Sequence, residues 1–302
     1  MADFALVCKS YRRDVGRVKR LLDSLQPHNP QRLPIFVIVP HDDLALFREA
    51  LGNHSVEFSS DEDVVRCQPH AGARDLLARY RATPGYRSQQ VIKAEAWRLI
   101  GCDSYLSMDS DTVFLRDARR EDFMAPGGHP YTLLHQSREL LQLAVNCNHA
   151  EVAEHFRAES ERLKKFFVRT GLDYDFGPQP LLWSARVWDD LQRQFLEARG
   201  WTLWDAIDAA PTEIRWYGEA LLAYRSIPIE PIEPLFRVYH YDWQWFALRR
   251  MGETPQKLAA EFIGVVYQSN WEYELDAAGV RSWLSRTARR LQRLRRRLQS
   301  MR

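Results

Sequence analysis

Short apolar runs alternate with stretches of helical period along the first half of the chain. Residues 3–9 form an apolar run, and after a polar loop the apolar residues recur at helical spacing over 15–25. A second run rich in β-branched residues, 33–40, precedes another helical stretch at 41–51. Because strands that alternate with helices usually pair in parallel through crossover helices, this pattern predicts an α/β fold with a mixed, mainly parallel sheet flanked by helices.

The pattern continues to about residue 275 without an internal repeat. We expect a weaker strand at 64–68, a helix at 88–100 and a strand at 104–108. Residues 138–170 are polar and mostly of helical period, which predicts an insertion or lid over the binding crevice. The remaining predictions are a strand followed by a helix from 177, a helix over 211–224 with Thr212 as its N-cap, an aromatic-rich stretch at 236–246, and a last strand at 264–268.

The composition is that of an ordinary globular protein: 45% of the 302 residues are hydrophobic and 27% are charged. No stretch approaches 18 consecutive apolar residues, and the first residues lack the basic and apolar regions of a signal peptide. We therefore expect a cytoplasmic protein whose main domain covers residues 1–280. The four cysteines are scattered without a CxxC pair, which predicts reduced and mostly buried thiols.

The net charge of +2 is unevenly distributed along the chain. Residues 281–302 contain nine Arg and no acidic residue, which leaves a net charge of −7 on residues 1–280. An acidic body argues against a nucleic-acid partner. Apolar residues at helical spacing in the tail, from Trp283 to Met301, predict a basic amphipathic helix. This helix would either dock on the acidic body or attach the protein peripherally to an anionic membrane surface.

Two carboxylates follow the strand predicted at 104–108. Asp109 and Asp111 lie two positions apart, so on a regular strand they would face the same side. In open α/β sheets, ligands bind at the carboxyl ends of the strands, and paired carboxylates there can share a divalent cation. Mg²⁺ and Mn²⁺ prefer such oxygen ligands and often complete their shells with substrate phosphate oxygens. The pattern also occurs in solvated turns, so its position after a buried strand is what favours a metal site.

Three segments carry a resemblance to nucleotide-sugar-dependent glycosyltransferases of the GT-A fold. They are residues 5–11, the helix at 87–93, and residues 105–115 with their D-x-D motif. Later segments, around 177–178, 211–213 and 268–270, are similar to a bacterial branch of that superfamily. The resemblance covers residues 3–275 and is most specific over 86–115. It implies transfer of a sugar from a nucleoside diphosphate sugar to a glycan or lipid-linked acceptor, as in the synthesis of bacterial surface polysaccharides.

The resemblance also implies roles for individual residues. Ser10 and Tyr11 would hold the nucleoside, and Asp109 and Asp111 would hold Mn²⁺ or Mg²⁺ against the diphosphate. The sugar donor would also contact the helix that precedes the D-x-D strand, at Arg87, Gln90 and Lys93. Many relatives add a late histidine as a further metal ligand; His240 matches it best in chain order, with Gln268 and Asn270 as rivals.

Glu213 is the candidate general base. It would deprotonate the acceptor hydroxyl if it faced the crevice, which would favour inversion at the anomeric carbon, although the sequence leaves inversion or retention open. Plainer roles remain for several of these residues. Glu213 could stabilise the start of its helix, Lys93 could belong to a solvated face, and His240 could be packed in the core.

Two other functional classes compete with the glycosyltransferase. A sugar-phosphate nucleotidyltransferase would share the sheet and the acidic metal ligands, but it usually has a glycine-rich basic loop after its first strand. Residues 9–16 contain one glycine. The other class is a catalytically inactive protein that binds carbohydrate or a partner on the same scaffold. The intact Asp109 and Asp111 argue against such degeneration.

Overall fold

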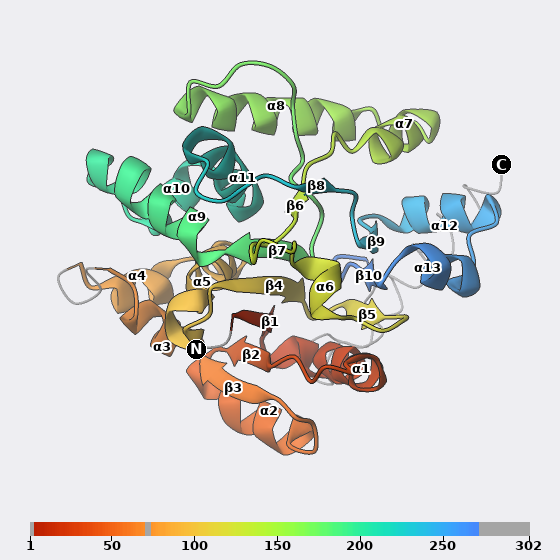
Figure 1. The fold of residues 1–302 in the computed structure, drawn as a ribbon, viewed down its shortest axis with the longest axis horizontal. Coiled ribbons are helices and arrows are strands. Elements are labelled where there is room, and N and C mark those ends of the chain that lie inside the picture. The colour runs from red at the N-terminus through yellow and green to blue at the C-terminus, as the bar shows by residue number, and fades with distance from the viewer. Residues whose placement is uncertain (1–2, 70–73, 272–302) are drawn as a thin grey trace, which may run out of the picture.

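The computed structural model describes residues 3–69 and 74–271, and a five-stranded sheet forms its centre (Figure 1). The strand order is β3-β2-β1-β4-β7. These strands are β1 (Phe4–Lys9), β2 (Ile35–Val39), β3 (Glu57–Ser60), β4 (Ser104–Asp109) and β7 (Leu181–Ser184). The first four run parallel and β7 pairs antiparallel to β4. The predicted α/β class with a mixed, mainly parallel sheet is therefore confirmed.

Helices cover both faces of this sheet. Along β1, Ala5 and Val7 belong to one buried apolar cluster, whereas Phe4, Leu6 and Cys8 belong to another. Successive strand side chains point to opposite faces, so a continuous apolar strand needs a core on each side. One core contains residues of α5 (Gly85–Ile100), α9 (Ala185–Asp190), α10 (Leu203–Ala209) and α11 (Glu213–Tyr224), and the other contains residues of α1 (Val15–Leu25) and α2 (Leu44–Leu51).

A second, three-stranded sheet adjoins the end of β4. Its order is β5 (Thr112–Phe114), β10 (Gly264–Tyr267) and β9 (Phe236–Tyr239), with β9 and β10 parallel. Strands β6 (Thr132–Leu133) and β8 (Pro231–Ile232) form a separate pair. Because β4 ends at Asp109 and β5 begins at Thr112, Ser110 and Asp111 form the turn between the two sheets.

The predicted helical insertion is present as α7 (Arg138–Asn146) and α8 (Glu151–Phe166), at the top of Figure 1. Two ion pairs fasten this region to α11. Arg215 Nε lies 2.7 Å from a Glu159 carboxylate oxygen, and Arg169 forms a bidentate ion pair with the buried Glu219. The insertion is thus anchored to the helix that begins at Glu213, while its role as a lid stays a prediction.

The prediction of a strand at 64–68 is wrong. Residues 64–66 belong to α3 (Asp61–Arg66), and the strand lies earlier, at β3. Ser60 caps this helix by accepting a hydrogen bond from the Asp63 amide, and three acidic residues fill the first turn, where the helix dipole favours them. Among the described residues, the remaining α-helices are α4 (Leu76–Ala82), α6 (Arg120–Phe123), α12 (Asp242–Arg250) and α13 (Pro255–Glu261).

Three smaller expectations have mixed outcomes. Thr212 occupies the N-cap position of α11, but its side chain makes no capping hydrogen bond. All four cysteines are free thiols, yet Cys67 is exposed and Cys147 is only partly buried. Within the described residues, no helix is both long and apolar enough to cross a bilayer. The basic tail at 281–302 lies outside the described residues, so its helix and the domain boundary at 280 stay predictions.

Candidate functional site

A pocket of about 620 Å³ opens where β1 and β4 end. The two strands pair in parallel with Lys9 opposite Asp109, so their last residues reach the pocket together. Among the residues that line it are Lys9, Tyr11, Asp14, Asp61, Tyr86, Asp109, Asp111, Gln268 and Asn270. The paired aspartates and an exposed aromatic ring at Tyr11 therefore share one cavity, at the edge of the sheet where α/β proteins bind ligands.

Asp111 is almost completely buried in the wall of this pocket. Its Oδ2 accepts a hydrogen bond of 2.7 Å from the Ser269 amide, whereas its Oδ1 is buried without a partner. Burial, and then the charge of Asp109, raises the pKa of Asp111 to about 7. A buried carboxylate oxygen without a donor is unfavourable unless a proton or a cation reaches it. Asp111 is therefore suited to bind a cation through Oδ1.

Asp109 forms an ion pair with Lys93. The Lys93 ammonium lies 2.6 Å from Asp109 Oδ1 and 3.5 Å from Glu213 Oε1, and the Lys93 and Glu213 side chains are both buried. Burial lowers the pKa of Lys93, but the charges of Asp109 and Glu213 outweigh it and the net shift is upward. Burial raises the pKa of Glu213, and Lys93 opposes this shift. Lys93 thus bridges two carboxylates as a buried cation.

The other predicted site residues lie in different surroundings. Gln90 accepts a hydrogen bond from the Glu213 amide and donates one to the Tyr86 carbonyl, so it braces the Lys93 cluster. Arg87 pairs with Asp208 at 3.1 Å, and Ser10 is buried. None of Gln90, Lys93, Arg87, Ser10 and Glu213 lines the pocket with the aspartates. Their direct roles in donor binding, and that of Glu213 as a base, stay predictions.

His240 lies in another pocket, next to His135. Burial lowers the pKa of His240, His135 lowers it further, and Asp175 opposes the shift. Within residues 3–69 and 74–271, no group of three or more His, Cys, Asp or Glu side chains could hold a metal ion. The structure therefore does not bring His240 to the aspartates, whereas the rivals Gln268 and Asn270 line their pocket.

Asp109 and Asp111 could nonetheless hold a divalent cation. Mg²⁺ is commonly bound through one or two carboxylates, with waters and substrate phosphates as the other ligands. The unpartnered Oδ1 of Asp111 and the oxygen donors along the wall fit this coordination, and they do not require a histidine.

Lys9, Asp61 and Tyr80 are among the lining residues that the sequence analysis missed. Lys9 Nζ lies 3.1 Å from Asp61 Oδ2, and the Tyr80 hydroxyl donates to the same oxygen at 2.9 Å. Lys9 could have been found, because it ends the first predicted strand directly before Ser10. Asp61 could not be placed, because it directly follows β3, which ends at Ser60, and the sequence analysis predicted this strand at 64–68.

Comparison with known proteins places the chain in a family. The model of a family of unknown function (DUF6492) matches residues 4–251. The chain belongs to this family. No curated protein matches the sequence significantly.

Two solved structures similar to this chain are glycosyltransferases. Mouse xyloside xylosyltransferase 1, in its apo form, has 10% identity and a TM-score of 0.49, and the match covers 89% of this chain and 99% of that one. The galactosyltransferase LgtC, in complex with donor and acceptor sugar analogs, has 13% identity and a TM-score of 0.49, with 91% and 92% covered.

The raised pKa of Asp111 predicts a pH-dependent stability. An acid with a higher pKa in the folded protein favours folding at low pH, and this contribution is lost as the pH rises from about 4 through about 7. Without metal, Asp111→Asn should therefore be more stable than the wild type at pH 8, with a smaller difference at pH 5. Urea unfolding in EDTA at the two pH values measures this. The exposed Asp42→Asn is the control, and a difference for Asp111→Asn that does not grow with pH would contradict the prediction.

Proposed function

We propose that this protein is a metal-dependent glycosyltransferase that moves a sugar from a nucleoside diphosphate sugar to an acceptor hydroxyl. The observation that carries the proposal is the buried Asp111, whose Oδ1 lacks a partner, beside Asp109 in a pocket at the strand ends. The resemblance of residues 86–115 to GT-A enzymes points to the same chemistry.

In this mechanism Asp109 and Asp111 hold Mn²⁺ or Mg²⁺. The bound cation would neutralise the negative charge that develops on the leaving diphosphate. Lys93 fixes Asp109 in position, because its buried ammonium lies 2.6 Å from a carboxylate oxygen of Asp109. Tyr11 and Tyr86 expose large aromatic surfaces at the pocket, and such surfaces stack with nucleobases.

The test is hydrolysis and transfer with a panel of nucleoside diphosphate sugars, with and without Mn²⁺. We expect metal-dependent release of a nucleoside diphosphate from at least one donor. A nucleotidyltransferase would instead release pyrophosphate from a nucleoside triphosphate and a sugar phosphate. If nucleotides bind but neither product forms under any condition, the protein would be an inactive binding protein on this scaffold.

The basic tail gives a separate prediction about location. We propose that residues 281–302 hold the enzyme beside lipid-linked acceptors, since each Arg near an anionic leaflet contributes about 1 kcal/mol. The full chain should sediment with anionic liposomes and be released by salt, whereas a chain that ends at Val280 should remain in the supernatant. Equal sedimentation of the two chains would rule out attachment through the tail.

A further inference from the structure

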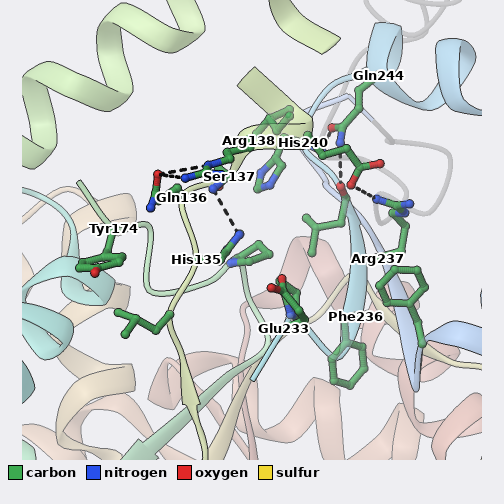
Figure 2. A pocket seen from close by; sticks show the side chains of 17 residues that line it. His135, Gln136, Ser137, Arg138, Tyr174, Glu233, Phe236, Arg237, His240 and Gln244 are labelled. Atoms are coloured by element: carbon green, nitrogen blue, oxygen red, sulfur yellow. Dashed lines mark hydrogen bonds and ion pairs between the residues drawn. The ribbon is translucent and has the colours of Figure 1, made fainter. Parts of the chain in front are cut away.

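A second pocket, of about 480 Å³, lies between the start of the insertion and the second sheet. Its walls come from residues 134–140 at the start of the insertion, from Tyr174 and Pro178, and from 233–244 around β9, together with Phe262 (Figure 2). None of these residues lines the pocket of Asp109 and Asp111. The insertion and the second sheet thus build a separate cavity.

Residues from the two pockets contact each other at the ends of β9 and β10. These strands pair in parallel with Tyr239 opposite Tyr267, so the residues that follow them, His240 and Gln268, leave the sheet at the same edge. The Asn270 side chain lines the aspartate pocket and donates a hydrogen bond of 3.2 Å to the His240 carbonyl. The His240 residue lines the second pocket. A ligand in one pocket would therefore lie next to a ligand in the other.

Hydrogen bonds fix the polar side of the second pocket. His135 Nδ1 accepts a hydrogen bond of 3.3 Å from the Ser137 amide, as the dashed line in Figure 2 shows. Its Nε2 makes no hydrogen bond and lies 3.9 Å from Asp175 Oδ2, which accepts one from the Ser137 hydroxyl. His135 is thus oriented by its surroundings, and its buried Nε2 lacks a hydrogen-bond partner.

The charges on the wall favour an uncharged ligand. The Arg237 guanidinium lies 2.8 Å from a carboxylate oxygen of Glu139 and 2.8 Å from one of Glu253. Glu139 and Glu233 both line the pocket, so its arginines do not create a net positive field for a phosphate. The rings of Tyr174 and Phe236 provide apolar surface. Aromatic rings beside polar side chains that are held by hydrogen bonds and ion pairs suit a compact hydroxylated molecule such as a sugar ring.

We propose that this second pocket binds the acceptor as an uncharged sugar ring, with His135 and His240 as hydrogen-bonding residues for its hydroxyls. The inference rests on the proposed function for its role in transfer, because transfer needs a second substrate beside the donor. It gives His240 an acceptor-binding role in place of the predicted metal-binding one.

The first experiment is saturation-transfer NMR of the full chain with a panel of methyl glycosides as probes. We expect at least one glycoside to receive saturation from the protein. His135→Ala should remove this signal, and His135→Gln, which retains polar atoms there, should weaken it several-fold. His155→Ala is the matched control, since His155 is exposed on α8 outside the pocket, and it should not change the signal. A signal that survives in both His135 variants, or none with any glycoside, would overturn the proposal.

A second measurement separates this proposal from the proposed function. Mn²⁺ bound at Asp109 and Asp111 should broaden the resonances of a glycoside in the adjoining pocket, and Asp111→Asn should abolish this broadening. Glycoside binding that depends on His135 without any metal-dependent nucleotide binding would refute the glycosyltransferase and retain the sugar site. Nucleotide binding with no glycoside signal would refute the sugar site alone.

Discussion

Asp111→Asn should abolish the metal-dependent binding of a nucleoside diphosphate. The substitution retains an oxygen that can accept from the Ser269 amide, but it removes the negative charge that a divalent cation requires. Even residues that only orient a metal ligand typically contribute 10–100-fold, roughly, to metal affinity, so we expect a loss at least this large. Calorimetric titration of the common nucleoside diphosphates, with and without Mn²⁺, measures it.

The stability of this variant makes the result interpretable. Because Asp111→Asn should be more stable than the metal-free wild type at pH 8, lost binding could not be ascribed to unfolding. Asp42→Asn, on the exposed surface, should bind as the wild type does. Unchanged nucleotide affinity in folded Asp111→Asn would refute the metal assignment.

Lys93→Met should strongly destabilise the fold. It would leave the Glu213 carboxylate buried and Asp109 partly buried without their shared cation. Removing one partner of a buried ion pair typically costs about 3–5 kcal/mol. Adding Glu213→Gln should recover part of this loss, since it removes one of the two unpaired charges. Urea unfolding of the two single variants and the double variant measures the coupling.

The same variants test the role of Glu213. A general base contributes about 10²–10⁴-fold to turnover, so its loss in Glu213→Gln should lower turnover far more than nucleotide affinity. A residue that only holds Lys93 would change stability and leave the pH profile of turnover unaltered. Strictly additive destabilisation in the double variant would show instead that Lys93 and Glu213 do not interact.

The sequence by itself determined most strands of the central sheet and the position of the paired aspartates. Apolar runs such as 33–40 are long and β-branched, and the helical periods between them are regular, so local pattern and tertiary packing agree there. The D-x-D pair could be placed because it lies at the end of a mostly buried strand, as β4 shows. The strand predicted at 64–68 was misplaced because β3 is short and only its last residue is buried, which leaves little apolar signal.

The tertiary structure decided which of the predicted residues meet. The Ser269 amide reaches Asp111 across 158 positions of the chain, and Lys93 reaches Glu213 across 120, so no local pattern encodes either contact. Glu213 follows a helix cap as predicted, yet only the packing of α11 against α5 determines that it points at Lys93 and not at the pocket wall. His240 follows its strand at the expected place in the chain, but residues 134–140, which lead into the insertion and include His135, line a second pocket around it. The order of residues along the chain predicts which strand a residue follows. The partners of its side chain depend on elements that are distant in the sequence and pack against it in the fold.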